Sequence, residues 1–171
     1  MKKILLLIAF LFAASNISAQ SFAVGPQVGY LNIKGSNEGT YQYGLSARFN
    51  FLFLGIEGTA SYAPKTFSST IKSTGYPLSV SGMVYVLPFI YGCAGLDWST
   101  EKYTIDLPGY DSQTVTSTTS GYHLGVGIQI SLGSLVLTGD ARYMFFNKEQ
   151  ISNTELDNNY YLLAIGVLFK L

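Results

Sequence analysis

The 171-residue chain is poor in cysteine, histidine and charge. It has one cysteine and one histidine, and only 12% of it is charged, with ten basic and ten acidic residues. The single cysteine, Cys93, excludes an intrachain disulfide framework, and the single histidine, His123, excludes a metal site built from several histidines. The balanced charge argues against a nucleic-acid partner, and the low charge argues against a disordered chain. We therefore expect no metal and no cofactor.

The first 19 residues have the pattern of a cleaved export signal. A basic start, Met1-Lys2-Lys3, precedes the apolar run Ile4–Ala14 and a short small-residue segment that ends at Ala19. This order is typical of a secretory signal, and the run is shorter than the ~20 residues of a membrane-spanning helix. We expect a signal peptide over residues 1–19 and a mature domain over residues 20–171, with eight basic and ten acidic residues and a net charge of −2. A retained N-terminal anchor is the alternative, and no cysteine follows the cleavage point to suggest a lipoprotein.

The rest of the chain alternates with a period of two rather than with a helical period. In each segment one face is apolar and the other carries small or polar residues, which is typical of strands. The expected strands are Phe22–Tyr30, Tyr41–Asn50, Leu54–Tyr62, Leu78–Val86, Ile90–Trp98, Tyr122–Ser131, Leu135–Phe145 and Tyr161–Leu171. The charged residues within them all fall on the polar face: Arg48, Glu57, Asp97, Asp140, Arg142 and Lys170.

The connectors between these strands alternate in length. Three are tight, at Phe51–Phe53, Leu87–Phe89 and Leu132–Ser134. Four are longer, at Lys34–Thr40, Ala63–Gly75, Ser99–Ser120 and Phe146–Asn159. Long and tight connectors in alternation indicate antiparallel strands with both chain ends on the side of the tight turns. We expect Ala63–Gly75 and Ser99–Ser120 to be long external loops.

The placement of large side chains decides between two kinds of barrel. A soluble barrel is apolar inside, whereas a membrane barrel is apolar outside, polar inside and ringed by aromatic side chains at both interfaces. Here the second pattern holds, and strands in lipid must close because unpaired backbone is not tolerated there. The aromatic girdle is expected to comprise Tyr30, Tyr41, Tyr62, Trp98, Tyr122, Tyr143 and Tyr161 near the long connectors, and Phe22, Phe49 and Phe169 near the tight turns. The sequence predicts an all-β, eight-stranded antiparallel up-and-down transmembrane β-barrel.

Two motifs carry a resemblance to a known family. They are the terminal strand Tyr161-x-Leu163-x-Ile165-x-Val167-x-Phe169-x-Leu171 and the segment Leu87-Pro88-Phe89-Ile90-Tyr91-Gly92-Cys93-Ala94-Gly95-Leu96. Over the mature chain the sequence resembles the small bacterial outer-membrane β-barrel family that includes the OmpA transmembrane domain and OmpX. The resemblance implies an outer-membrane location, periplasmic chain ends and assembly by the barrel-assembly machinery. Members usually end in Phe, so Phe169 and Leu171 are the expected assembly signal.

Four inward charges are the first candidate site. Arg48, Glu57, Asp140 and Arg142 are expected to point into the lumen, where they would form either an ion-conducting constriction or a buried network that fills the interior. Two arginines face two acids, and buried charges need partners. Because eight strands leave little room for water, we expect the network.

His123 is the second candidate, because two eight-stranded enzymes that modify lipid A use a histidine. The deacylase places a Ser two residues after its His, and Gly125 stands there in this chain, so that triad is absent. The palmitoyltransferase uses His, Asp and Ser near its outer rim. Asp97 and several loop serines satisfy that composition, although no amphipathic helix precedes Phe22. We expect instead a rim histidine that is hydrogen-bonded to a loop, and no catalytic residues.

The sequence thus predicts a non-enzymatic outer-membrane protein with a structural or surface-interaction role, such as adhesion or ligand binding, through its long loops. A lipid-modifying enzyme and a narrow, porin-like pore are the alternatives. The expected partners are outer-membrane lipid, lipopolysaccharide and the barrel-assembly machinery, and we expect a monomer.

Overall fold

The described residues form eight strands and the short turns between them, and Leu171 follows the last strand. The computed structural model describes residues 20–33, 39–66, 71–105, 113–146 and 159–171. The export signal expected over residues 1–19 lies outside them. The strands are β1 (Gln20–Ile33), β2 (Gly39–Phe51), β3 (Leu54–Thr66), β4 (Ile71–Leu87), β5 (Ile90–Ile105), β6 (Gln113–Leu132), β7 (Leu135–Phe146) and β8 (Asn159–Lys170).

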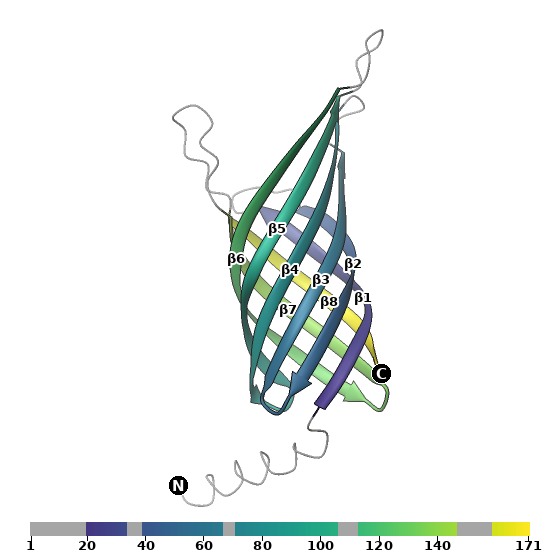
Figure 1. Ribbon diagram of the computed structural model, residues 1–171, viewed down its shortest axis with the longest axis vertical. Helices are drawn as coiled ribbons and strands as arrows, with labels where there is room; N and C mark the ends of the chain where they lie inside the picture. The colour runs from purple at the N-terminus through teal and green to yellow at the C-terminus, as the bar shows by residue number, and fades with distance from the viewer. Residues whose placement is uncertain (1–19, 34–38, 67–70, 106–112, 147–158) are drawn as a thin grey trace, which may run out of the picture.

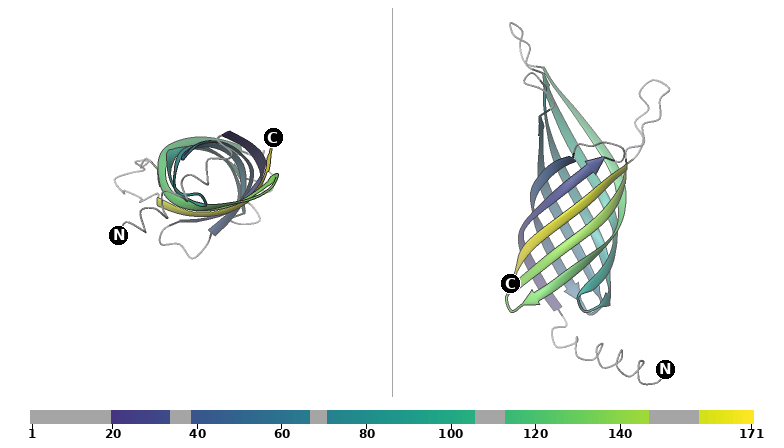
Figure 2. Two further views of the ribbon diagram at one scale, coloured as in Figure 1. Left: turned by 90° about the horizontal axis from the view of Figure 1, so that it is seen from below. Right: turned by 180° about the vertical axis from the view of Figure 1, so that it is seen from behind.

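The strands form one closed antiparallel barrel (Figure 1). Each strand pairs with the next along the chain, and β1 pairs with β8 from Ala23↔Lys170 to Ile33↔Tyr160. Viewed along the barrel, the strands make a complete ring (Figure 2). The predicted all-β, eight-stranded up-and-down barrel is therefore confirmed. None of the described residues forms a helix long and apolar enough to span a membrane.

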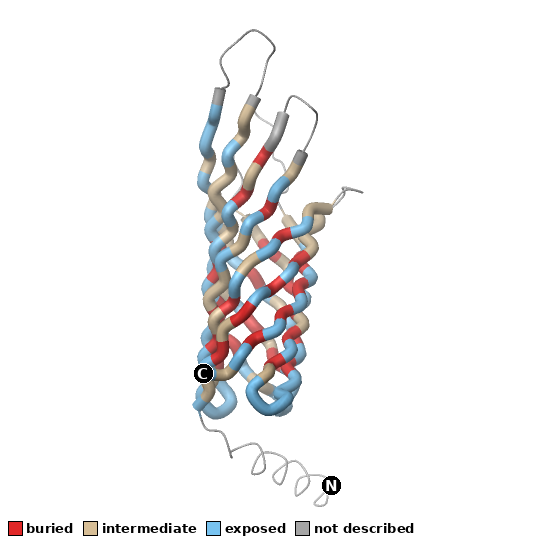
Figure 3. The backbone as a smooth tube through the Cα atoms, turned by 90° about the vertical axis from the view of Figure 1, so that its right-hand side faces the viewer, coloured by how far each residue is buried: buried red, intermediate tan, exposed pale blue. Residues whose placement is uncertain are grey.

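Alternation along each strand sorts side chains to the two faces of the barrel wall. Buried and exposed residues follow one another along the strands (Figure 3). Leu45, Ile56 and Ile165 are among many large apolar side chains exposed on the outer surface, whereas charged and polar side chains are buried inside. Small apolar clusters complete the interior, such as Met83, Tyr91 and Cys93. The wall thus has an apolar outer coat around a largely polar interior.

The tight turns lie at one end of the barrel, called here the turn end. They are formed by Leu52–Phe53, Pro88–Phe89 and Gly133–Ser134, as the sequence predicts. Gly133 has a φ of 64°, a left-handed conformation that favours glycine. Leu171 also lies at this end, where its backbone N–H donates to the carbonyl of Phe22 at 2.9 Å. The opposite end is called the mouth.

Two connectors that the sequence predicts as loops are largely strand instead. β5 and β6 remain paired out to Ile105↔Gln113, and β3 and β4 out to Thr66↔Lys72. On the other side, the described residues of β6 and β7 pair as far as Gly121↔Phe146. The prediction of loops at Ala63–Gly75 and Ser99–Ser120 was therefore wrong over most of both segments. The strands continue beyond the mouth as a raised sheet (residues 63–66, 71–77, 99–105 and 113–120), prominent at the top of Figure 1.

The β6 part of the raised sheet escaped prediction because the two sides of that strand meet the same surroundings. Thr114, Val115 and Thr116 are exposed in succession on β6, so inward and outward positions there differ little. Period-two alternation arises only where one side of a strand is buried or the two sides differ. The segment is nevertheless rich in Thr, a β-branched residue that is favoured in strands.

Candidate functional site

A buried network of four charged side chains occupies the barrel interior. Arg48 on β2 donates from Nε to Glu57 Oε2 on β3 at 2.8 Å, and its Nη2 also donates to this carboxylate. Arg142 on β7 donates from Nη2 to Glu57 Oε1, and to Asp140 Oδ1 at 3.1 Å. Arg48 Nη2 lies 3.8 Å from Asp140 Oδ2. Two cations and two anions thus neutralise one another where all four are buried.

Register explains part of this arrangement. Arg48 and Glu57 are directly paired on β2 and β3, which puts their side chains side by side on the inner face. Arg142 comes from a strand that is not adjacent to β3, and it reaches Glu57 only because the wall closes on itself. The four residues predicted to share the lumen are therefore brought together by two different means, strand pairing and closure.

Neutral side chains that sequence reasoning missed extend the network. The Tyr91 hydroxyl donates to Asp140 Oδ1 at 2.7 Å and accepts from Arg48 Nη2 at 3.0 Å. Arg48 Nη1 donates to Gln129 Oε1 at 2.9 Å, and the Tyr85 hydroxyl donates to the same oxygen at 2.7 Å. The sequence did contain a signal for Tyr91, because it alternates in step with the inward residue Asp97 along the predicted strand Ile90–Trp98. Aromatic residues were instead sought on the outer face.

His123 sits inside the barrel between Asp97 and Ser81. Its Nδ1 lies 2.8 Å from Asp97 Oδ2, and its Nε2 lies 3.0 Å from Ser81 Oγ. Its partners thus come from strands β5 and β4, so the prediction of a rim histidine bonded to a loop was wrong. The relay spans three adjacent strands because Gly95, which is paired with both Ser81 and His123, has no side chain. A Cβ on Gly95 would stand 2.6 Å from His123 Cε1.

The relay continues into the charge network. Arg142 Nη1 donates to Ser81 Oγ at 3.2 Å. A consistent set of roles follows: the Ser81 hydroxyl donates to His123 Nε2, and His123 N–H at Nδ1 donates to Asp97. An Asp–His–Ser relay also activates serine nucleophiles. Here, however, Ser81, His123 and Asp97 are 0%, 1% and 2% exposed, so the hydroxyl is closed to substrate.

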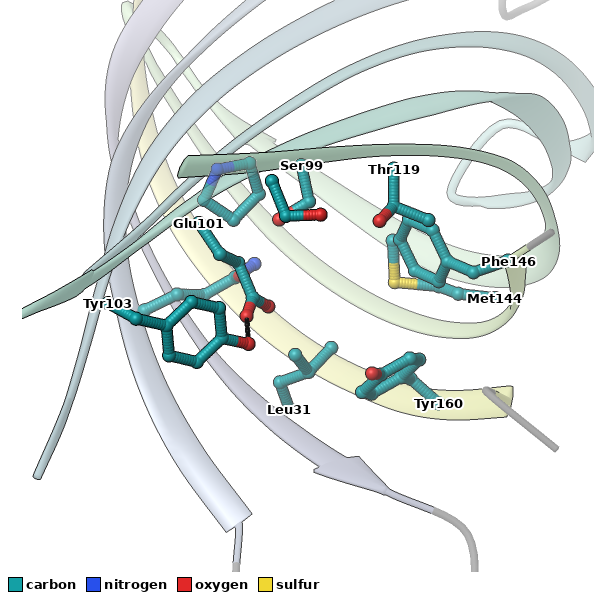
Figure 4. Close-up of a pocket in the computed structure, with 11 residues that line it drawn as sticks. Leu31, Ser99, Glu101, Tyr103, Thr119, Met144, Phe146 and Tyr160 are labelled. Atoms are coloured by element: carbon teal, nitrogen blue, oxygen red, sulfur yellow. Dashed lines mark hydrogen bonds between the residues drawn. The ribbon is translucent and has the colours of Figure 1, made fainter. Parts of the chain in front are cut away.

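A cavity of about 360 Å³ opens at the mouth (Figure 4). One part of its lining is apolar or aromatic, and the rest carries hydroxyl or other polar groups and one carboxylate, Glu101. The described lining residues are Leu31, Gln42, Pro77, Ser99, Glu101, Tyr103, Ser117, Thr119, Met144, Phe146 and Tyr160. Sequence reasoning treated Ser99–Ser120 as a loop and so could not place Ser99, Glu101 or Tyr103 in a cavity.

The ten residues predicted as an aromatic girdle lie on the outer surface at both ends of the barrel. Tyr30 and Tyr143 are half-buried and the others are exposed. Toward the mouth the rings touch, with centroids 5.2 Å apart for Tyr30 and Tyr41 and 4.8 Å apart for Tyr143 and Tyr161. At the turn end Phe22 and Phe49 are directly paired on β1 and β2. Phe169 and Leu171, the predicted assembly signal, are exposed at that end as well.

Cys93 is a buried free thiol. Within the part of the chain that the structure describes, no three His, Cys, Asp or Glu side chains gather in a way that could hold a metal ion.

Comparison with known proteins gives a family and several structures of similar fold. Residues 4–169 match the family model described as outer membrane protein beta-barrel domain. A major outer membrane protein of Thermus thermophilus is 16% identical with a TM-score of 0.62, covering 90% of this chain and 100% of that one. Neisserial surface protein A is 17% identical with a TM-score of 0.55, covering 90% and 98%.

A third structure is Ail, the attachment invasion locus protein of Yersinia pestis, in complex with the heparin analogue sucrose octasulfate. It is 16% identical with a TM-score of 0.55, covering 89% of this chain and 97% of that one. At these identities the likeness is one of fold. A search of curated proteins found no match to the chain.

Proposed function

The chain belongs to the family of outer membrane protein β-barrel domains, and from this premise we propose that it is a non-enzymatic surface-interaction protein that contacts ligands through its raised sheet. Membership of the family implies the bacterial outer membrane as its location. The apolar outer coat suits lipid, and the buried ionic interior suits a narrow eight-stranded barrel.

The proposed orientation puts the turn end in the periplasm and the mouth outside the cell. Short periplasmic turns and longer external segments are the rule in outer-membrane barrels. An export signal over residues 1–19 fits this orientation, as do periplasmic chain ends, with Phe169 and Leu171 offered to the barrel-assembly machinery. The outer coat would then contact lipid, and the mouth side would meet lipopolysaccharide.

The raised sheet is the observation that carries the proposal. A connection between neighbouring strands needs only a few residues. Here β5 continues through Ser99–Ile105, seven residues or about 23 Å of strand beyond the mouth, and it stays paired on both sides. Hydroxyl side chains occur on this sheet, among them Thr100 and Thr118 in a cross-strand hydrogen bond of 3.2 Å. A paired sheet of this length is more than the connection between strands requires, and it offers an ordered surface for contact with a ligand.

The names of two proteins with the same fold also support a surface-interaction role. One is called a surface protein and another an attachment protein that was crystallised with a sulfated sugar analogue of heparin. Since the likeness is confined to fold, the choice of ligand stays open to experiment.

The test shortens the raised hairpin without touching the barrel. Residues 101–117 are replaced with Asn-Gly, a two-residue hairpin turn, between the paired Thr100 and Thr118. Cells producing either form are applied to immobilised heparin. We expect adhesion with the full-length protein and its loss with the shortened one.

A gel-mobility difference between unheated and boiled protein, present in both forms, controls for barrel folding. Equal adhesion by cells with the full-length form, the shortened form and no protein would contradict the surface-contact proposal.

The alternative, a lipid-modifying enzyme, is favoured by the Asp97–His123–Ser81 geometry. It requires Ser81 to become accessible. Mass spectrometry of lipid A from a host producing the protein tests it, with Ser81→Ala as the comparison. Lipid A that is identical in all three strains (host, wild type and variant) removes the alternative.

A further inference from the structure

The mouth cavity is lined by a single charged group among the described residues, the carboxylate of Glu101. Inward positions on β5 alternate, so that Asp97, Ser99, Glu101 and Tyr103 point to the interior side of the strand. The second acid on this face, Asp97, lies below the cavity and is engaged by His123. Glu101 is therefore the one formal charge among the described residues that line the cavity.

Glu101 makes no ion pair with any described residue. The Tyr103 hydroxyl donates a hydrogen bond to its Oε2. The nearest lysine in sequence, Lys102, is exposed on the opposite side of β5, with its Nζ 5.6 Å from the centroid of the Tyr76 ring. The half-buried carboxylate of Glu101 thus has a neutral hydroxyl as its hydrogen-bond partner among the described residues.

The wall across from Glu101 is aromatic and apolar. Tyr160 and Phe146 stand edge to face with centroids 5.3 Å apart, and Met144 and Leu31 lie beside them (Figure 4). Tyr103 adds a third ring on the side of Glu101. Ring faces attract organic cations, and the attraction grows when water is displaced.

We propose that the mouth cavity binds a small organic cation with an apolar body, of the alkylammonium or arylalkylammonium class. The ammonium group would lie against Glu101 and the Tyr103 hydroxyl, with the body packed against Met144, Phe146 and Tyr160. Hydroxyls of Ser99 and Thr119 would accept its remaining N–H groups. A volume of about 360 Å³ is within the range of small-molecule sites. An anion would meet the Glu101 carboxylate with no cation among the described lining residues to offset it.

This site goes beyond the surface-contact proposal and does not depend on it. The ligand occupies the cavity that the inward side of the raised sheet shares with β1, β2, β7 and β8. Its binding to the purified protein is measured with a small molecule, whereas adhesion is measured on cells. Either proposal can fail alone.

Three probes of one shape test the assignment: 2-phenylethylammonium, 2-phenylethanol and phenylacetate. Binding to the folded mature protein in non-ionic detergent is measured by isothermal titration calorimetry. We expect the ammonium to bind at least tenfold more tightly than the alcohol, and phenylacetate to bind more weakly than both.

Two matched variants locate the effect. Glu101→Gln keeps the shape of the side chain and should weaken the ammonium at least tenfold while leaving the alcohol unchanged. Lys102→Gln alters charge on the neighbouring, outward residue of the same strand and should leave all three affinities unchanged. Thermal unfolding of each variant checks that the barrel is intact.

The proposal is overturned if the alcohol binds as tightly as the ammonium, if Glu101→Gln binds the ammonium like the wild type, or if none of the probes binds.

Discussion

Glu57 shows what the barrel interior demands of a single charged residue. Both guanidiniums of the network donate to its carboxylate, one to each oxygen, and the group is fully buried. Removing one partner from a buried ionic network leaves the remaining charge desolvated and unpaired, which costs about 3–5 kcal/mol. Glu57 therefore stabilises the fold because its carboxylate pairs with two buried guanidinium groups.

We predict that Glu57→Gln lowers the free energy of unfolding by about 3–5 kcal/mol, measured by urea titration in detergent or lipid vesicles. Lys102→Gln, which changes an exposed charge, should cost less than about 1 kcal/mol. Adding Arg48→Met to Glu57→Gln should cost less than the sum of the single changes, because Arg142 and Asp140 then balance. Equal effects of Glu57→Gln and Lys102→Gln would contradict a structural role for the network.

At the scale of strands, glycines on opposite faces of the wall have opposite roles. Gly95 on β5 faces inward, where a Cβ would stand 2.2 Å from the Val80 carbonyl oxygen and 2.6 Å from the His123 ring. Gly58 on β3 is on the outer phase, and a Cβ there would have nothing within 4 Å. The absence of a side chain is therefore a packing requirement at the first position only.

We predict that Gly95→Ala destabilises the barrel by about 1–3 kcal/mol, the usual cost of overpacking, and disturbs the His123 ring. Gly58→Ala should be neutral or stabilising by up to about 1 kcal/mol, since glycine weakens a strand interior. Thermal unfolding measures the stability, and the NMR resonances of the single histidine measure the ring environment. Equal tolerance of both substitutions would show that strands β4, β5 and β6 pack less closely than the structure indicates.

At the scale of the whole molecule, closure leaves an interior filled by side chains. The network of Arg48, Glu57, Asp140 and Arg142 is joined to Asp97 through Ser81 and His123, and to Tyr85 through Gln129. Eight strands enclose just enough space for such side chains. The barrel is accordingly a wall around a packed core and not an open tube.

We predict that the purified protein gives no discrete conductance steps in planar bilayers, under conditions where a larger porin, added as a positive control, does. The physical reason is that ions would have to displace buried, mutually paired charges. Reproducible single-channel steps from the wild-type protein would establish the pore alternative in place of the filled interior.

Local pattern along the chain was enough to identify the strand count, the barrel class and the inward face of Arg48, Glu57, Asp140 and Arg142. These features follow from the period-two alternation of residues within one strand, which can be recognised without knowing which strands lie beside it. Where both sides of a strand meet similar surroundings, as at Thr114–Thr116, odd and even positions do not differ in a way that reveals a strand. That segment was therefore predicted to be a loop.

The sequence by itself determined that the apolar residues coat a barrel and that the few charges are confined to its lumen, its ends and its connectors. Only the tertiary structure decided which inward groups meet. Arg142 and Glu57 are 85 positions apart, and His123 and Ser81 are 42 apart. The contact of Arg142 with Glu57 depends on closure between β8 and β1, and the contact of His123 with Ser81 depends on the register of β4, β5 and β6. The mouth cavity has the same origin, because its walls come from strands that meet only when the barrel closes.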